Sequence, residues 1–271
     1  MADDRRKEED TMICSDIIQK IEERYPTRYA LEWDNVGLLA GRMDKEVKKI
    51  YIALDATDEV IDEAVTWGAD MLLTHHPMIF KPVKRVTDQD FIGRRLMKMI
   101  QNDLSYYAMH TNYDVKGMAA LAAEYLDMEG TEVLDVTSVE NGIEEGIGRV
   151  GSLKCEMTLA QCCGFVKEKL MLPNVKVFGN LGTKVKRIAV SPGSGKSVIS
   201  DALAKQADVL VTGDVDHHEG IDAVAQGLTV IDAGHYGTEY IYVGDMRKFC
   251  QVHFPQIEIK TAPIKHPFQV L

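Results

Sequence analysis

The chain has 271 residues, 45% of them hydrophobic and 27% charged, which is the composition of a soluble globular protein long enough for one large or two ordinary domains. Its formal net charge of −11 argues against a protein that coats nucleic acid or lies on an anionic membrane, because both need a cationic face. No apolar stretch approaches the length of a membrane span, so we expect neither a nucleic-acid nor a membrane partner. Small basic groups that could still meet a phosphate, or simply be solvated, are Lys81, Lys84 and Arg85, and Lys184, Lys186 and Arg187.

The five cysteines are odd in number and show no C-x-x-C spacing. Because the chain also begins without a signal-peptide pattern, this usage indicates a reducing compartment, and we expect a cytoplasmic protein. The first eleven residues, Met1 to Thr11, are mostly charged. They predict a loose tail or an extension ahead of a start at Met12.

Helical and strand patterns alternate in the first half of the chain. Apolar residues on one face predict a helix over 15–24, and a turn-rich stretch with a short strand follows at 31–41. Buried strands are expected at 48–54, 69–74 and 104–109, and helices at 59–67, 91–102 and 118–125. Strands that alternate with helices imply right-handed crossovers and a mainly parallel sheet.

An acidic, loop-like stretch over 135–148 is the best candidate for a domain crossing. Beyond it the pattern predicts strands at 148–154 and 175–178, a helix at 158–170 and a glycine-rich turn at 191–195. We expect the first α/β domain to comprise residues 1–127 plus 240–271, and the second to comprise residues 128–239.

The second half of the sequence repeats the first. A shift of 138 positions superposes eight identical residues, so that Ile50, Val60, Ile61, Ala64, Ala69, Asp70, Leu72 and Thr74 fall on Ile188, Val198, Ile199, Ala202, Ala207, Asp208, Leu210 and Thr212. Buried strands and amphipathic helices are built from few types of residue, so such a match could also arise by convergence. A second match is harder to dismiss, because a shift of 125 places His110 and Asp114 on His235 and Glu239. The sequence therefore predicts two similar α/β domains built from an internal repeat.

Two adjacent histidines, His75 and His76, end the strand expected at 69–74, and Pro77 stops it. The carboxyl edge of an open α/β sheet is where ligands bind. Neighbouring strand residues point to opposite faces, so both imidazoles reach one ligand only if the chain turns here, as Pro77 favours. The alternative is a pair of ordinary surface histidines in a loop.

Histidine and carboxylate four positions apart lie on one side of a helical turn, where both can reach one cation. The pairs His110/Asp114 and His235/Glu239, taken with the adjacent histidines, offer too many ligands for a single tetrahedral zinc. Imidazoles and carboxylates without a thiolate suit two first-row cations such as Zn, Fe, Mn, Co or Ni, with Asp114 and Glu239 as natural bridges. We therefore predict a di-metal site in the cleft between the domains. If these residues are instead caps at strand ends, the chain is a metal-free scaffold.

A third group lies between Thr212 and Glu219 and contains Asp214 and His218. We interpret these two residues as groups that support the ligands or touch the substrate, the alternative being a solvated loop. The turn Ser191–Ser197 is similar to a P-loop but lacks its first glycine, because Val190 stands there. Such a turn can bind an anion weakly, or it can simply let the backbone turn tightly.

Together these motifs resemble the NGG-interacting-factor-3-like family of dinuclear-metal proteins, whose members are often labelled GTP cyclohydrolase type 2 homologues. The similarity runs in order along most of the chain, through Trp33-Asp34-Asn35-Val36-Gly37-Leu38, Thr74-His75-His76-Pro77, His110-Thr111-Asn112-Tyr113-Asp114, Gly193-Ser194-Gly195, Thr212-Gly213-Asp214 and Ala233-Gly234-His235-Tyr236-Gly237-Thr238-Glu239. Each motif alone is weak, whereas the combination is specific.

The resemblance implies two α/β domains with a two-metal site in the cleft between them, and a ring-shaped homohexamer. It implies five metal ligands, His75, His76, Asp114, His235 and Glu239. We expect two divalent ions per chain and a hydrolase that acts on a nucleotide-like or phosphorylated small molecule, GTP cyclohydrolase-like or phosphoesterase-like, with a metal-activated water as nucleophile and His110 and His218 as helpers. The alternative is a metal-binding, ring-forming regulatory or interaction protein without turnover.

Overall fold

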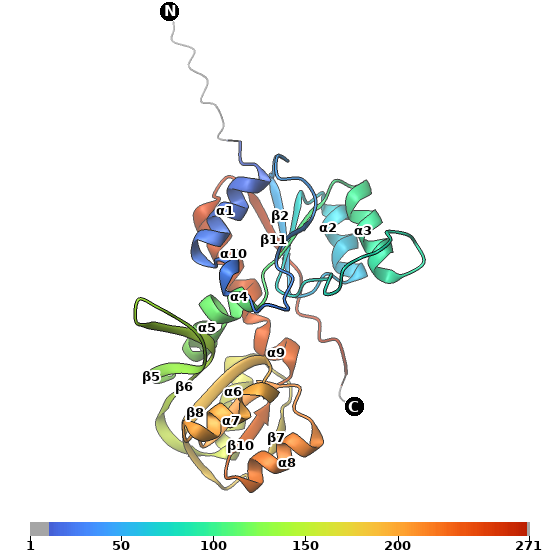
Figure 1. The fold of residues 1–271 in the computed structure, drawn as a ribbon. Coiled ribbons are helices and arrows are strands. Elements are labelled where there is room, and N and C mark those ends of the chain that lie inside the picture. The colour runs from blue at the N-terminus through green and yellow to red at the C-terminus, as the bar shows by residue number, and fades with distance from the viewer. Residues whose placement is uncertain (1–10, 270–271) are drawn as a thin grey trace, which may run out of the picture. The chain divides into compact units, whose positions relative to one another are not determined.

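The structure is a computed structural model that describes residues 11–269 (Figure 1). The tail predicted at the N-terminus lies outside the described residues, except for its last residue. Helices alternate with strands along two sheets, which confirms the α/β class. The described chain forms two compact units, unit 1 with residues 11–27, 32–110 and 245–262, and unit 2 with residues 28–31, 111–244 and 263–269.

Unit 1 contains a five-stranded sheet in the order β1-β4-β3-β2-β11. The strands are β1 (Gly37–Ala40), β2 (Lys49–Ala53), β3 (Met71–Thr74), β4 (Ser105–Ala108) and β11 (Glu258–Thr261). The helices are α1 (Cys14–Arg24), α2 (Asp58–Trp67), α3 (Phe91–Gln101) and, continuing from unit 2, α10 (Ile241–His253). A 3-10 turn, η1 (Thr27–Tyr29), begins in unit 1 and continues into unit 2. All neighbours are parallel except β1, which runs antiparallel to β4. Figure 1 shows α1 on one face of this sheet and α2 and α3 on the other, which explains why β3 and β4 are buried along their whole length.

Unit 2 contains a six-stranded sheet in the order β5-β6-β8-β9-β10-β7. The strands are β5 (Glu129–Glu140), β6 (Ile143–Thr158), β7 (Lys176–Phe178), β8 (Lys184–Ser194), β9 (Val209–Gly213) and β10 (Thr229–Asp232), and the helices are α4 (Thr111–Tyr113), α5 (Ala119–Tyr125), α6 (Leu159–Lys169), α7 (Ile199–Ala204), α8 (His217–Ala225) and α9 (His235–Glu239), with a π-helical turn η2 (Asp114–Met118) and a 3-10 turn η3 (Lys196–Val198). The strands β8, β9 and β10 are parallel, and the other pairs are antiparallel.

The loop expected over 135–148 is wrong, because β5 and β6 form a long antiparallel hairpin there. The turn falls at Asn141 and Gly142, whose φ angles are 52° and 80°. Two successive residues with positive φ match the type I′ turn that Asn-Gly favours in two-residue hairpins. The Asn-Gly pair was therefore the sequence signal of a hairpin, and the acidic residues around it led to the prediction of a loop in place of strands. The domain boundaries expected at 127 and 239 remain a prediction, while the compact units change over near residues 110 and 244.

The internal repeat is visible in the backbone hydrogen bonds of the two units. The Oδ2 atom of Asp70 accepts the N–H groups of Lys48 and Lys49 at 2.8 and 3.0 Å. At positions 138 residues later, Oδ2 of Asp208 accepts the N–H groups of Lys186 and Arg187 at 2.8 and 2.7 Å. In each unit one carboxylate just ahead of a strand therefore holds the backbone of the preceding strand at the point where the parallel pairing begins.

In the second match of the repeat, the strands correspond at a shift that is one residue smaller than the shift of the histidines. Thr74 pairs with Ala108 in unit 1, and Thr212 pairs with Asp232 in unit 2, so the strands β4 and β10 correspond at a shift of 124. The histidines that follow correspond at 125, because unit 2 has an extra residue, Gly234, between strand and histidine. Gly234 has a φ of 77°, a left-handed conformation that glycine adopts without strain.

The five cysteines are free thiols, and all but Cys155 are buried. Burial raises the pKa of Cys162 and Cys250 to about 12, so these thiols stay protonated near neutral pH. Between residues 11 and 269, the structure contains no helix that is both long and apolar enough to cross a bilayer.

The paired carboxylates give a test of the repeat. We expect Asp70→Ala and Asp208→Ala each to lower the free energy of unfolding by about 1–3 kcal/mol, because each removes the acceptor of two backbone N–H groups. Urea denaturation followed by circular dichroism measures both values. Asp222→Ala, at an exposed position of α8, is the control. A loss no larger than that of the control at either site would contradict the equivalence of the two halves.

Candidate metal centre

The turn after β3 is held by side chains of β3 and β4. The Thr74 hydroxyl donates to the carbonyl oxygen of His76 at 2.9 Å, and the buried Tyr106 hydroxyl donates to the same oxygen at 3.0 Å. Tyr106 also accepts the N–H of Met78 at 2.8 Å. Burial raises the pKa of Tyr106 to about 12, so the hydroxyl keeps its proton near neutral pH. The chain turns as predicted here, and the rings of His75 and His76 lie with their centroids 4.8 Å apart.

Three histidines of unit 1 lie together at the carboxyl edge of the sheet. His75, His76 and His110 can each offer a ring nitrogen within 4.8 Å of those of the other two. The Nδ1 atom of buried His75 lies 3.0 Å from the carbonyl oxygen of Met109. A carbonyl oxygen only accepts, so Nδ1 of His75 carries the proton and Nε2 keeps a lone pair in the neutral ring.

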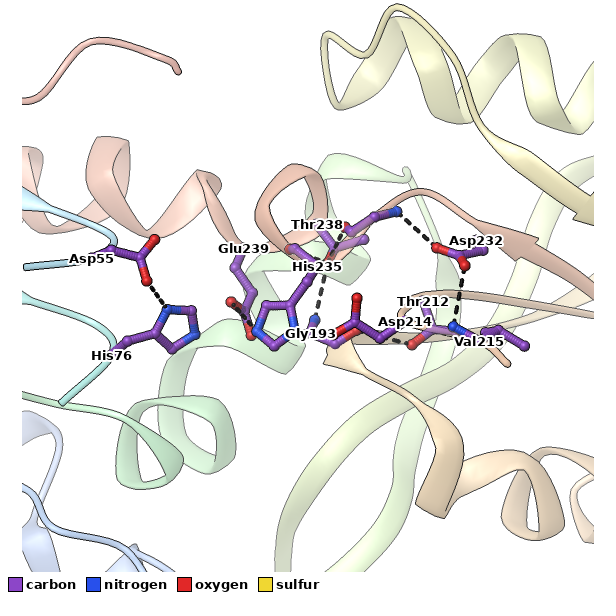
Figure 2. Close-up of polar contacts among 11 residues, drawn as sticks. Asp55, His76, Gly193, Thr212, Asp214, Val215, Asp232, His235, Thr238 and Glu239 are labelled. Atoms are coloured by element: carbon purple, nitrogen blue, oxygen red, sulfur yellow. Dashed lines mark hydrogen bonds and ion pairs between the residues drawn. The ribbon is translucent and has the colours of Figure 1, made fainter. Parts of the chain in front are cut away.

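The other two histidines of this group are held by carboxylates. Nδ1 of His76 lies 2.8 Å from Oδ1 of Asp55, as Figure 2 shows, and Nδ1 of His110 lies 2.9 Å from Oδ1 of Asp34, whose side chain is fully buried. Histidines that bind metals in proteins almost always donate their other ring N–H to a carboxylate or a carbonyl oxygen. All three histidines therefore have the orientation of metal ligands that bind through Nε2.

Unit 2 presents a similar arrangement at the start of α9. Nε2 of His235 lies 3.0 Å from Oε2 of Glu239 one helical turn later, and Nδ1 of His235 lies 2.7 Å from Oδ2 of Asp214 (Figure 2). Glu239 is only 3% exposed. A buried carboxylate is costly unless a positive charge or hydrogen bonds compensate it, which a bound cation would supply.

The glycine-rich turn at the end of β8 lies directly beside Glu239. A Cβ atom added to Gly193 would lie 2.3 Å from Oε1 of Glu239 and 3.5 Å from Nε2 of His235. The Gly193 N–H donates to the Thr238 hydroxyl at 2.9 Å, which ties the turn to α9 (Figure 2). Of the two roles left open for this turn, the structure shows the tight backbone turn, because Gly193 has a left-handed φ of 73°. It also shows a feature that was not expected, the close approach of the backbone to Glu239.

The structure places the remaining predicted residues as follows. Asp114 opens the π-helical turn η2, a distortion that is frequent at functional sites. Asp214 supports a candidate ligand, in agreement with its interpretation. His218 is exposed in the first turn of α8, where its ring lies against that of His217, and its helper role remains a prediction.

Sequence reasoning missed the roles of Asp34 and Asp55. Asp55 follows β2 at the same sheet edge as the histidines that follow β3, so its position along the strand order was an available signal. Asp34 lies in an Asp-Asn turn, in which its Oδ1 accepts the N–H of Asn35 at 2.9 Å. Nothing in the sequence linked it to His110, 76 residues later.

The donor sets of both units fit first-row divalent cations. Imidazole nitrogens and carboxylate oxygens without thiolates are the ligands that Zn, Fe, Mn, Co and Ni accept. The structure thus contains histidine and glutamate groups that could bind metal ions.

An α/β protein with histidine clusters at its sheet edges matches a known group. The chain belongs to the Duf34/NIF3 (NGG1p interacting factor 3) family, whose model matches residues 12–267. A relative from Clostridium perfringens, called GTP cyclohydrolase 1 type 2 homolog, is 38% identical over 231 residues, which cover 84% of this chain and 87% of the relative. One from Clostridium acetobutylicum with the same name is 35% identical over 248 residues, covering 91% and 92%.

Solved structures give the same result for the fold. A Bacillus cereus protein related to NIF3 superposes with a TM-score of 0.88 at 27% identity, covering 96% of this chain and 99% of that protein. Reduced HcgD from Methanocaldococcus jannaschii superposes with a TM-score of 0.80 at 32% identity, covering 94% and 99%. The resemblance inferred from the motifs is confirmed.

The close approach at Gly193 can be tested with a matched glycine. Gly193 and Gly68 have φ angles of 73° and 76°, but a Cβ at Gly68 would meet nothing within 4 Å. Both alanine variants should lose about 1–2 kcal/mol of stability from the left-handed backbone. Only Gly193→Ala should also displace Glu239 and weaken Co²⁺ binding by about tenfold or more in calorimetric titrations. Equal Co²⁺ affinities of the two variants would contradict this role.

Proposed function

We propose that the chain is a dinuclear metal-dependent hydrolase that acts on a nucleotide-like or phosphorylated small molecule. The observation that supports this most directly is the anchoring of the histidines. Nδ1 of His76, His110 and His235 each lies within 2.9 Å of a carboxylate oxygen. Outer carboxylates of this kind fix the ring and raise its basicity toward a cation.

The proposed ligands of two divalent ions are His75, His76, Asp114, His235 and Glu239. When bound, such cations would supply Lewis-acid chemistry, which lowers the pKa of water and neutralises charge on a phosphoryl or carbonyl oxygen. The chain's own residues hold the imidazoles in place. His110, oriented by Asp34, is suited to move a proton at Nε2.

The substrate class is proposed from the relatives and the ligand chemistry. Curated relatives carry the name GTP cyclohydrolase 1 type 2 homolog, and GTP combines a base with phosphates. Carboxylates neutralised by cations would accept an anion despite the acidic chain. A cytoplasmic location is proposed from the free thiols.

A second candidate is a ring-forming regulatory or interaction protein whose metals hold a shape. It is favoured by the tip of the β5–β6 hairpin, where Val139 and Ile143 are 60% and 63% exposed. Apolar side chains that stay exposed at the tip of a long hairpin suit contacts with other chains. For either function we propose a homohexamer, which light scattering after gel filtration would measure. Loss of assembly on chelation without any turnover would favour this candidate.

The hydrolase proposal predicts the effect of removing one carboxylate charge. Protein loaded with two metal ions per chain should turn over a member of a panel of GTP, other nucleotides and phosphoesters. Glu239→Gln should lower that turnover at least about 100-fold, because a neutral amide is a weaker ligand for divalent cations than a carboxylate. Glu168→Gln, on the exposed side of α6, is the control. Turnover that survives Glu239→Gln at the control's level would reject the mechanism.

The anchoring carboxylates give a test that needs no substrate. Asp55→Ala and Asp214→Ala should each weaken Zn²⁺ or Co²⁺ binding by about 10–100-fold, because the rings of His76 and His235 lose their orientation and part of their basicity. Competition with a chromophoric chelator measures the affinity, with Asp222→Ala as the control. Affinities equal to that of the control would show that these contacts only cap strand ends.

A further inference from the structure

Two exposed aromatic side chains flank His110 in unit 1. Trp33 is 61% exposed and Phe80 is 53% exposed. Their ring centroids lie 5.8 and 6.0 Å from that of the His110 imidazole, with interplanar angles of 74° and 83°. Single exposed aromatics are common on protein surfaces, but two that share one candidate site histidine are not explained by packing in the core.

Short hydrogen bonds join the two chain segments that carry these aromatic side chains. Asp34, next to Trp33, accepts from both His110 and the N–H of Asn35. The Asn35 amide donates to the carbonyl oxygen of Ile79, next to Phe80, at 2.6 Å. The segments that carry the two rings are therefore joined directly, so a ligand would find the pair already arranged.

A basic pocket continues from Phe80 along the connection between β3 and α3. The pocket has a volume of about 660 Å³, and Phe80, Lys81, Lys84 and Arg85 are among its lining residues. Ligand pockets commonly have volumes of about 300–1,000 Å³. Its only lining carboxylate, Asp90, already accepts the N–H of Gly93 at the start of α3.

The three cationic side chains of this pocket lack carboxylate partners among the described residues, although the chain is acidic overall. Within residues 11–269, neither Lys81, Lys84 nor Arg85 forms an ion pair, although the formal net charge of the chain is −11. Most other surface cations, such as Arg95 with Asp58, face a carboxylate. Three unneutralised cations on one short segment create a local positive potential that favours a phosphate.

We propose that Trp33 and Phe80 receive the planar base of a nucleotide-like ligand, and that Lys81, Lys84 and Arg85 bind its phosphates. Aromatic side chains stack on any base, and the cations add the charge complementarity that a phosphate requires. This assignment rests on the proposed function, because it deepens the substrate class of the same site. The ligand is a free nucleotide rather than a nucleic-acid polymer, since the net charge of the chain opposes a polyanion.

The two tryptophans of the chain provide a direct test. Trp67, the second one, packs against Tyr51 in the core of unit 1. Trp67→Phe leaves Trp33 as the only indole reporter, and Trp33→Phe leaves Trp67. GTP titrated in EDTA should quench the fluorescence of Trp67→Phe in a saturable way and leave that of Trp33→Phe unchanged, whereas ribose 5-phosphate should quench neither. If Trp67→Phe is misfolded by circular dichroism, equilibrium dialysis of wild type against Trp33→Ala replaces it, with an expected loss of GTP affinity of about tenfold.

A second arm tests the basic pocket. The triple variant Lys81→Ala, Lys84→Ala and Arg85→Ala should weaken GTP binding by about tenfold or more and leave guanosine binding unchanged. A variant with the same charge change elsewhere, Lys154→Ala, Arg247→Ala and Lys248→Ala, is the matched control, because these side chains are exposed and lie outside the basic pocket. Equal GTP affinities of the two triple variants, or equal quenching of both tryptophans, would overturn the assignment.

The same samples separate this assignment from the proposed function. Bound metal and turnover without quenching of Trp33 would reject the nucleotide site alone. Quenching of Trp33 in a protein that binds no metal would reject the hydrolase and keep the nucleotide site. Tight binding of a single-stranded oligonucleotide, with no response to GTP, would assign the surface to nucleic acid and reject the proposal.

Discussion

An imidazole ring has two nitrogens, and a protein decides which of them faces a ligand by holding the other. In this molecule Nδ1 is held in every histidine of the candidate site, by Asp55, Asp34, Asp214 or the carbonyl oxygen of Met109. The rest of the site depends on this constraint, because it sets both the direction of Nε2 and the basicity of the ring. The carboxylates and the carbonyl oxygen that hold Nδ1 come from segments at the edges of the two sheets.

The two sheets provide these edges by the same construction. Asp70 and Asp208 fix their strands with equivalent pairs of hydrogen bonds, and the parallel strands that follow bring successive chain segments to one edge. The two halves differ at the residues that surround the candidate metal ligands. Gly234 adds a residue before His235, and Gly193 keeps the space that Glu239 fills. The scaffold is thus repeated, whereas the functional side chains of each unit are arranged individually.

Most of the architecture could be predicted from the sequence, but only part of the candidate metal site could. Buried strands and amphipathic helices have strong periods, so their positions in β2 to β4 followed directly, as did the repeat marked by Asp70 and Asp208. The hairpin around Asn141 was missed because its strands are exposed and acidic near the turn, and exposed segments of a strand have no strong apolar period. Asp34 and Asp55 were missed for another reason: a contact between residues 76 or 21 positions apart depends on tertiary packing, which no local pattern records.

The carboxylates that anchor the two corresponding histidines come from unrelated places in the fold. His110 is held by Asp34, which precedes β1, whereas His235 is held by Asp214, which follows β9. The repeat therefore copied the imidazoles without copying their supports. Substitution of Asp34 leaves the hydrogen bond that holds His235 in place, and substitution of Asp214 leaves the hydrogen bond that holds His110 in place. Evolution or an engineer can accordingly adjust the strength of each histidine separately, an independence that a perfectly duplicated protein would lack.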